Sequence, residues 1–260
     1  MLKNKSALVT GSTSGIGLGI ARALSRAGAN VMLNGFGDAD AIGRLCRELA
    51  DAGGGRVAYH AADVRSAAEV AALVAATEQA FGGVDILVNN AGIQFVSPTE
   101  DFPEERWDAV LDTVLNASFH AIKAALPGMR RRNWGRIVNL VSVHGLIASP
   151  FKSAYVAAKH GQIGLTKTVA LEVAETGITC NAVCPGYVLT PLVEGQIDRQ
   201  AQVHQLPRER VIREVMLAAQ PSKRFVEIDD VAALILFLCG DAAKSITGAA
   251  IPIDGGWTAR

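Results

Sequence analysis

The sequence has little of several features that would assign it to other classes of protein. Its 25 basic residues balance 25 acidic ones, so no excess of charge favours nucleic acid or an anionic membrane as a partner. It contains no apolar run of 18 residues and no apolar signal segment after Met1, so we expect a cytoplasmic protein. Cysteine is scarce and lacks the paired spacing of zinc ligands, so we expect no metal site and reduced core thiols at Cys46, Cys180, Cys184 and Cys239.

Strand-like and helix-like segments alternate along the 260 residues. Runs of aliphatic and β-branched residues predict strands at 7–10, 30–34, 56–61, 86–89, 136–141, 179–183 and 250–253. Helical spacing predicts helices at 17–27, 67–81, 107–129, 154–176 and 228–239. The strands are almost continuously apolar, which indicates a parallel sheet with helices on both faces. The sequence therefore predicts one α/β domain over 1–260, a doubly wound parallel β-sheet of the Rossmann-like kind.

Two further patterns concern the connections. Gly28, Gly82 and Gly177 follow predicted helices, where a left-handed residue often ends a helix. The segment 190–225 breaks the alternation because it is polar and contains three prolines. We expect one or two helices there, outside the sheet. They form either a small mobile lid over the substrate or an ordinary peripheral helix pair.

A glycine-rich turn directly follows the first predicted strand. Its glycines allow a tight turn and a close approach of the backbone to a pyrophosphate, which free N–H groups and the helix dipole would stabilise. The spacing, Gly-x3-Gly-x-Gly, differs from the commoner dinucleotide fingerprint, and a purely structural turn is the alternative. The predicted phosphate-binding residues are Gly11, Thr13, Ser14, Gly15, Ile16 and Gly17.

The order of motifs resembles the short-chain dehydrogenase/reductase family over essentially the whole chain. These motifs are Thr10 with the glycine turn, Asp63, Asn89-Asn90-Ala91-Gly92, Ser142, Tyr155-x3-Lys159 and Pro185-Gly186. The resemblance implies that Asp63 and Val64 flank the adenine and that Asn90, Ala91 and Gly92 line the cofactor cleft. It also implies that the nicotinamide is held by Pro185, Gly186, Val188 and Thr190.

The residues after the second strand bear on the choice of cofactor. Neither a carboxylate for ribose hydroxyls nor a cation for a 2′-phosphate occurs in Asn34-Gly35-Phe36-Gly37. Ser14 stands where phosphate-binding relatives often carry a base. A dianionic phosphate would be poorly compensated here, so we expect NAD. Phe36 either packs beside the adenosine or makes a plain hydrophobic contact.

Tyr155 and Lys159 are one helical turn apart and project from the same face. An ammonium group beside a phenol lowers the phenol pKa, so Tyr155 is predicted to act as general acid and base. Ser142 can donate a hydrogen bond to the substrate oxygen. The resemblance adds that Lys159 binds the nicotinamide ribose. A Tyr-x3-Lys pair alone is usually only a solvated pair; the glycine turn and Ser142 favour catalysis.

One position departs from the family. Many relatives carry an asparagine behind the lysine, about 28 residues before the serine, and here that position is Val114. Asn116 is two positions away, which rotates a helical side chain by roughly 200°. We therefore do not expect Asn116 to replace it. Either water and backbone carbonyls take over the relay, or turnover is slower.

Five further motifs border the predicted pocket: Asn90–Gln94, Ser142–Gly145, Ser149–Gly161, Thr190–Gln196 and Asp254–Trp257. Together they resemble those of bacterial D-3-hydroxybutyrate dehydrogenases within the family. The resemblance implies NAD-dependent oxidation of (R)-3-hydroxybutyrate to acetoacetate by a homotetramer. It implies a carboxylate site of Gln94, His144, Lys152 and Gln196, an apolar wall at Trp257 and Tyr187 near the substrate methyl group. Each of these residues also has an ordinary structural interpretation, such as a capping histidine or a solvated lysine. The alternatives for function are a 3-oxoacyl thioester reductase and a catalytically silent NAD-binding regulator.

Overall fold

Within residues 2–259, which the computed structural model describes (residue 192 by its backbone alone), seven parallel strands form a sheet of order β3-β2-β1-β4-β5-β6-β7. The order in which the chain adds strands to the sheet reverses between β1 and β4. Open α/β sheets bind their ligands at such a point. The strands are β1 (Ser6–Val9), β2 (Asn30–Asn34), β3 (Val57–His60), β4 (Ile86–Asn89), β5 (Gly135–Leu140), β6 (Ile178–Pro185) and β7 (Ala250–Ile253).

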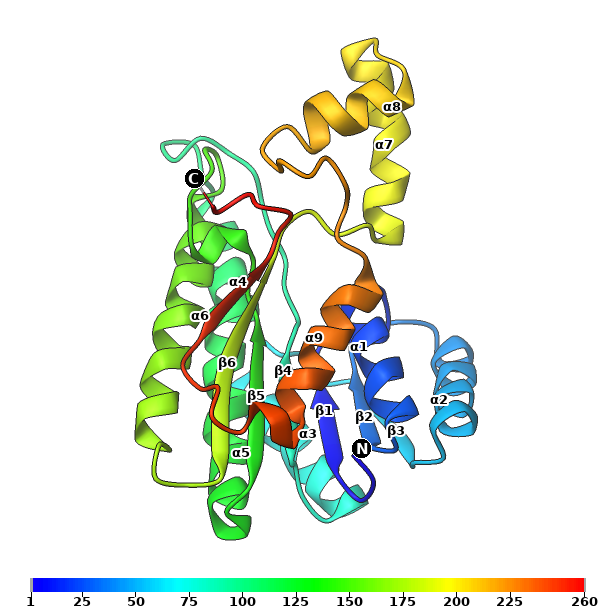
Figure 1. Cartoon of the computed structure of the whole chain (residues 1–260), viewed down its shortest axis with the longest axis vertical. Helices are drawn as coiled ribbons and strands as arrows, with labels where there is room; N and C mark the ends of the chain where they lie inside the picture. Colours follow the sequence, from blue (N-terminus) through cyan, green and yellow to red (C-terminus); the bar gives the residue numbers. More distant parts are fainter. Residues whose placement is uncertain (1, 260) are drawn as a thin grey trace.

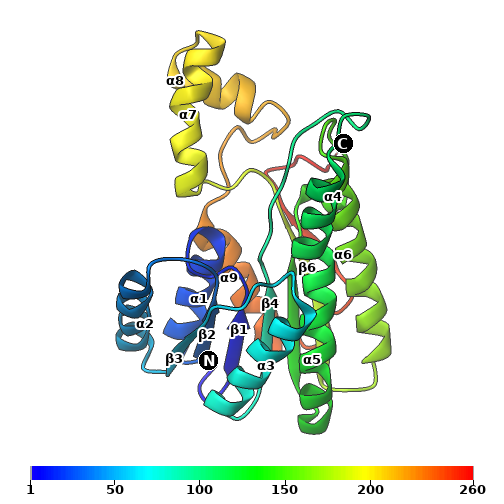
Figure 2. The ribbon, with the colours of Figure 1, turned by 180° about the vertical axis from the view of Figure 1, so that it is seen from behind.

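Helices cover both faces of the sheet, which confirms the predicted doubly wound fold. One face, toward the viewer in Figure 1, carries α1 (Gly15–Arg26), α2 (Ala39–Gly53) and α9 (Ile228–Cys239). The other, seen in Figure 2, carries α3 (Ala67–Phe81), α5 (Ala117–Arg132) and α6 (Ser153–Glu172). The central strands are fully buried between two apolar layers, so their carboxyl ends are rigidly placed.

The helical segment that runs into α5 packs against different elements before and after a π-helical turn. Helix α4 (Glu104–Leu111) passes through a π-helical turn, η1 (Asp112–Asn116), directly into α5. Before and within this turn, Val110 and Val114 pack against Ala154 and Ala158 of α6. After it, the apolar residues of α5 join the core between the sheet and α3. The sequence pattern predicted a helix here but not the π turn.

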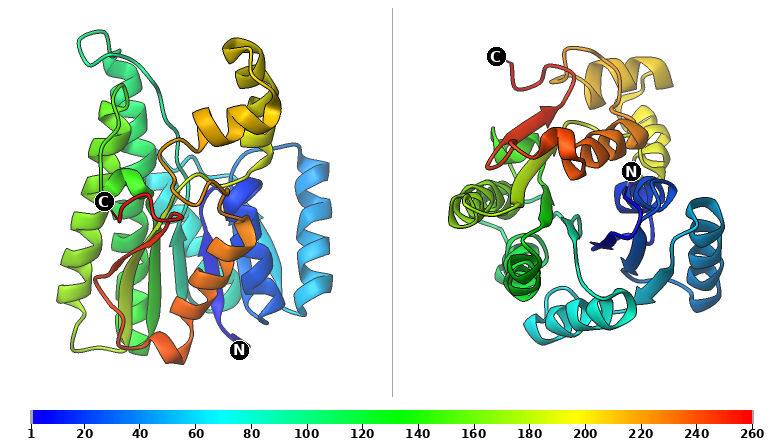
Figure 3. Two further views of the ribbon diagram at one scale, coloured as in Figure 1. Left: turned by 45° about the horizontal axis from the view of Figure 1, so that its top comes forward. Right: turned by 60° about the horizontal axis from the view of Figure 1, so that its bottom comes forward.

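The segment after β6 forms the expected helices outside the sheet. These are α7 (Pro191–His204), the single turn α8 (Arg208–Val211) and the π-helical η3 (Ile212–Met216). They project past the carboxyl ends of the strands in Figures 1 and 3 and enclose a small cluster of Ile197, Val211 and Met216. A parallel β-bridge between Val188 and Val226 joins the chain just before α7 to the chain just before α9.

Two expectations about the connections were incomplete or wrong. Helix α2 was not predicted, although its apolar residues recur at helical spacing from Ile42 to Leu49. Asp38 starts it by accepting a hydrogen bond from the Ala41 N–H. Gly28 and Gly82 are left-handed as expected, with φ of 94° and 88°. Gly177 is not left-handed. A glycine is needed there because a Cβ would lie 2.2 Å from the Asn133 carbonyl oxygen.

The four cysteines are free thiols, and three of them are buried as expected. Cys46, on α2, is partly exposed instead. In the part of the chain that the structure describes, no helix has both the length and the apolar character needed to cross a membrane. The same residues bring no group of three His, Cys, Asp or Glu side chains together as metal ligands.

Candidate active site

The glycine turn between β1 and α1 forms a cradle that only small residues allow. Gly11 and Gly15 have φ of 62° and 55°. A Cβ at Gly17 would lie 2.4 Å from both the Asn90 Nδ2 and the Gly11 carbonyl oxygen, whereas a Cβ at Gly15 would enter open space. Ser14 precedes α1 without a side-chain capping bond, so N–H groups of the first turn remain available to an anion. The residues fit a pyrophosphate.

Thr10 and Asn90 lock the cradle to the end of β4. The Asn90 amide donates to the Thr10 and Gly11 carbonyl oxygens at 2.8 and 2.9 Å. The Thr10 hydroxyl accepts from the N–H groups of Asn90 and Ala91 at 3.0 and 3.1 Å. Asn90 and Ala91 of the predicted cleft thus lie against the glycine turn, and Gly92 follows them.

The end of β2 lies beside the same turn. Both the oxygen and the nitrogen of the Asn34 amide are used in hydrogen bonds within the fold. The oxygen accepts from the Gly11 N–H, and the nitrogen donates to the carbonyl oxygens of His60 and Ala62. Thr13 donates to the Phe36 carbonyl oxygen at 2.9 Å. The Phe36 ring is 71% exposed, so it is free to pack against a ligand at the cradle.

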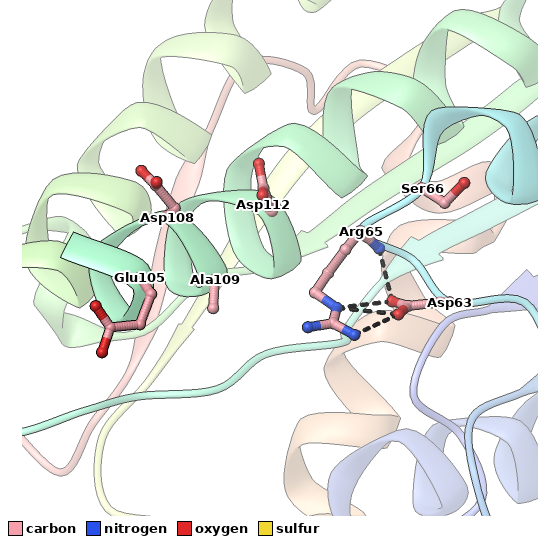
Figure 4. Close-up of a pocket in the computed structure, with 7 residues that line it drawn as sticks. All are labelled: Asp63, Arg65, Ser66, Glu105, Asp108, Ala109 and Asp112. Atoms are coloured by element: carbon pink, nitrogen blue, oxygen red, sulfur yellow. Dashed lines mark hydrogen bonds and ion pairs between the residues drawn. The ribbon is translucent and has the colours of Figure 1, made fainter. Parts of the chain in front are cut away.

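Asp63 and Val64, the predicted adenine residues, follow β3. Val64 is buried, and the Asp63 carboxylate is held by the Arg65 guanidinium, which lowers the Asp63 pKa (Figure 4). Arg65 borders an open hollow of about 430 Å³. Across it stand three acidic side chains of α4 and η1, namely Glu105, Asp108 and Asp112.

The predicted nicotinamide residues lie in the segment that leads from β6 to α7. Pro185 ends β6, and the Gly186 N–H donates to the Ile253 carbonyl oxygen at 3.0 Å. A Cβ at Gly186 would lie 2.5 Å from the Gln220 Oε1, so the backbone is tightly packed there. Val188 is buried at the bridge to Val226, and Thr190 caps α7. These residues emerge at the same edge of the sheet as the cradle.

Ser142, Tyr155 and Lys159 meet where β5 ends and α6 begins. Ser142 follows the strand, and the interaction of its hydroxyl with Tyr155 favours a lower Tyr155 pKa. The Lys159 ammonium lies 5.6 Å from the centroid of the Tyr155 ring and donates to the Leu140 carbonyl oxygen at 2.7 Å. Burial lowers the Lys159 pKa to about 7.

The expected lowering of the Tyr155 pKa by Lys159 is wrong for the protein alone. Burial raises the Tyr155 pKa to about 12, and only the hydrogen bond with Ser142 opposes this shift. The physical reason is the placement of the ammonium, which contacts the ring face and backbone oxygen rather than the phenolic oxygen. Tyr155 therefore holds its proton firmly at neutral pH until another cation reaches its hydroxyl.

His144 connects the catalytic group to the predicted substrate wall. Its Nδ1 lies 3.4 Å from the Ser142 Oγ and its Nε2 lies 2.7 Å from the Ser149 Oγ. Its ring packs edge-on against Tyr155 and Trp257, with centroids 6.0 and 5.7 Å apart. Burial, with smaller repulsion from Lys152 and His160, lowers the His144 pKa to about 4. His144 is therefore neutral at pH 7.

The remaining substrate candidates lie on separate elements. Lys152 sits just before α6 and is half-buried, and burial lowers its pKa. Gln94 is exposed on the loop after β4, which is joined to the Lys152 loop by a hydrogen bond from the Ser97 N–H to the Phe151 carbonyl oxygen. Gln196 is on α7. The Tyr187 ring packs against Phe225 in the cluster under α7 and α8.

Asn116, which we expected to lie outside the catalytic group, is exposed, and its amide donates to the Asp112 carboxylate at 2.7 Å. The valine at 114 is fully buried beneath the start of α6, so an apolar side chain fills the place behind the lysine. The sequence analysis missed two buried polar residues near this place, Ser118 and Gln162, because one hydroxyl and one amide on apolar helices give no motif.

Comparisons with known proteins agree with this geometry. A family model described as enoyl-(acyl carrier protein) reductase matches residues 11–258. The chain is 57% identical to a D-beta-hydroxybutyrate dehydrogenase of Rhizobium meliloti (strain 1021), over 98% of this chain and 99% of that protein. It is 56% identical to a D-beta-hydroxybutyrate dehydrogenase of Cupriavidus necator over the full length of both. A crystal structure of actinorhodin polyketide ketoreductase with NADPH superposes with a TM-score of 0.90 at 38% identity, covering all of both chains. The chain belongs to the short-chain dehydrogenase/reductase family.

Proposed function

We propose that the protein catalyses the NAD-dependent oxidation of (R)-3-hydroxybutyrate to acetoacetate and the reverse reduction. The observation that carries this proposal is the single group formed by Ser142, Tyr155, His144 and Trp257. In this group the proposed proton-transfer residues, Ser142 and Tyr155, lie beside His144 and Trp257, the proposed wall of the substrate pocket. The two D-beta-hydroxybutyrate dehydrogenases that are 56% and 57% identical to this chain support the choice of substrate.

The proton-transfer chemistry falls to Tyr155. In reduction, the Tyr155 hydroxyl would give its proton to the substrate oxygen and become a phenolate. In oxidation, the phenolate would take the alcohol proton as the C–H bond gives up a hydride. A bound nicotinamide supplies the hydride acceptor or donor and, when oxidised, a positive charge that favours the ionised phenol. Ser142 donates to the substrate oxygen and stabilises the charge that develops there. Lys159 holds a second positive charge beneath the Tyr155 ring.

The carboxylate of the substrate needs donors at the other end of the pocket. Lys152 is the cation on the loop before α6, and its partial burial strengthens a charge-assisted hydrogen bond. Neutral His144 holds the Ser142 and Ser149 hydroxyls in place through its two ring nitrogens. Gln94 on its loop and Gln196 on α7 would reach the carboxylate only when those segments close on the substrate. We therefore propose that 190–225 is a lid, with Tyr187 at its base near the substrate methyl group.

The cradle and the end of β2 support NAD as the cofactor. Gly11 to Gly17 would hold the pyrophosphate, and Phe36 would pack beside the adenosine with Asp63 and Val64 near the adenine. Residues 34–37 offer no cation to a 2′-phosphate. Lys159 would bind the nicotinamide ribose. The proposal includes a homotetramer in the cytoplasm, acting on a small molecule rather than on nucleic acid or a membrane.

Initial rates with D- and L-3-hydroxybutyrate, each with NAD and NADP, test this function in the wild type and in Tyr155→Phe. We expect activity with the D-acid and NAD, and a loss of at least about a hundredfold in the variant, the usual size of a general acid-base contribution. Activity confined to acetoacetyl thioesters with NADPH would replace the proposal with thioester reduction. Tight NADH binding without turnover of either class would indicate a silent regulator.

A further inference from the structure

Lys159 is buried and needs fixed acceptors to remain charged and oriented. It is 2% exposed, and its ammonium donates to the Leu140 carbonyl oxygen at 2.7 Å and to the Gln162 Oε1 at 2.9 Å. An ammonium has three N–H donors. Within residues 2–259 these are the two acceptors that hold it, so one donor remains for a ligand.

Gln162 continues the chain away from the site. Its Nε2 donates to the Ser118 Oγ at 2.7 Å, and that hydroxyl donates to the Val114 carbonyl oxygen at 2.8 Å. Gln162 is 0% exposed and Ser118 is 2% exposed. A hydrogen-bonded path of buried side chains thus runs from Lys159 to the backbone of the residue that departs from the family.

The direction of every bond in this path is fixed by its two ends. An ammonium can only donate, and a carbonyl oxygen can only accept. Ser118 must therefore donate to Val114 and accept from Gln162, which turns the amide nitrogen toward Ser118 and the amide oxygen toward Lys159. No other orientation of the Gln162 amide satisfies both neighbours.

The backbone of Gln162 is anchored separately. The Thr166 hydroxyl donates to the Gln162 carbonyl oxygen at 2.7 Å and accepts from the Asn139 amide at 2.8 Å. Asn139 in turn accepts from Asn89 at 2.8 Å, so this side of α6 is tied to β5 and β4. Side chain and backbone of Gln162 are both fixed, which makes its amide oxygen a rigid acceptor.

We propose that Gln162, oriented by Ser118, is the positioning residue for the Lys159 ammonium. Its amide oxygen reaches the ammonium from α6 itself, three residues further along the helix, and the Val114 side chain, which is apolar, offers it no acceptor. The inference rests on the proposed role of Lys159 in the reaction, and it assigns no contact of Gln162 with substrate or cofactor.

The test is the pH dependence of NADH binding, measured by fluorescence between pH 5 and 9, together with the rate of 3-hydroxybutyrate oxidation. Gln162→Leu removes the acceptor, Gln162→Glu makes it anionic, and Ser118→Ala frees the amide while leaving it present. Thr77→Val is the matched control, because it removes a fully buried helical hydroxyl that bonds only to its own α3 backbone at the Leu73 carbonyl oxygen.

The variants shift the Lys159 titration in opposite directions. The wild-type affinity for NADH should fall as the ammonium deprotonates near its pKa of about 7. Gln162→Leu should move this midpoint down by about one pH unit and Gln162→Glu up by about one, with a smaller downward shift for Ser118→Ala. Cys184 of β6 and Tyr155 are the titratable groups facing the lysine, and burial raises their pKa values to about 11 and about 12, above the tested range.

A structural role alone would lower thermal stability in all four variants and leave the midpoints together. The inference is overturned if Gln162→Leu and Gln162→Glu share the wild-type midpoint, if both move in the same direction, or if wild-type binding is flat over this range. Because NADH binding needs no substrate, a wild type that binds NADH but does not oxidise D-3-hydroxybutyrate overturns the proposed function separately.

Discussion

The neutral state of His144 makes a quantitative prediction about stability at acidic pH. Burial lowers its pKa from 6.5 to about 4, so the native protein resists protonation of a ring that the unfolded chain protonates readily. Below pH 6.5 the unfolded state therefore binds more protons, and the free energy of unfolding falls as the pH falls. The stability that depends on neutral His144 is complete above pH 6.5 and is lost progressively toward pH 4.

The size of the loss in unfolding free energy follows from the size of the His144 pKa shift. One pKa unit corresponds to about 1.4 kcal/mol, and the linkage between pH 7 and pH 5 gives a loss of about 2 kcal/mol. We would compare urea unfolding of the wild type and His144→Gln at both pH values and at one protein concentration. The amide keeps a hydrogen-bonding side chain that does not titrate. The wild type should lose about 2 kcal/mol more than the variant.

Replacement of the exposed histidine on α7, His204→Gln, controls for the general effect of removing one imidazole. If the difference between wild type and His144→Gln stays constant from pH 7 to pH 5, the ring is not buried in its neutral form. That result would refute the interpretation of the contacts with Ser142, Ser149 and Trp257 as a closed pocket wall.

Two further predictions concern the ligands. Gly17→Ala should weaken NADH binding at least about tenfold in a fluorescence titration, because the new Cβ would lie 2.4 Å from the Asn90 amide that braces the cradle; unchanged affinity would show that the turn does not hold the dinucleotide. Lys152→Met should raise the KM for 3-hydroxybutyrate by roughly 10- to 100-fold, the value of a charge-assisted hydrogen bond, and leave the KM for NAD unchanged; an equal effect on both would place Lys152 outside the substrate site.

The fold could be predicted from the sequence because its determinants are local. The apolar run 86–89 coincides with a strand buried on both faces, which has few polar positions to blur its ends. The run 250–253 coincides with the partly buried edge strand β7. Helix α2 could also have been predicted, because its apolar residues from Ile42 to Leu49 recur at helical spacing and Asp38 is a favourable N-cap residue.

The site could be predicted where chemistry requires a fixed spacing and not where it depends on tertiary contacts. Tyr155 and Lys159 are one helical turn apart, and the glycine spacing of 11–17 directly follows the first strand. The effect of Lys159 on the Tyr155 pKa was mistaken, because spacing does not reveal that the ammonium points at a backbone oxygen. Gln162 was missed because its partners, Ser118 and Lys159, are brought together only by the packing of α5 against α6.

The π turn at Asp112–Asn116 makes this region more sensitive to changes in chain length than to changes in side chain. It rotates α4 relative to α5, so residues before it face the site and residues after it face the sheet. Deletion of one residue would let the helix run on without the wide turn and swing one half by about 100°. Val114 would leave α6, and the carbonyl that receives Ser118 would turn with it. An exposed position such as Asn116 can accept substitutions, whereas a single-codon deletion within 112–116 would separate α6 from its support.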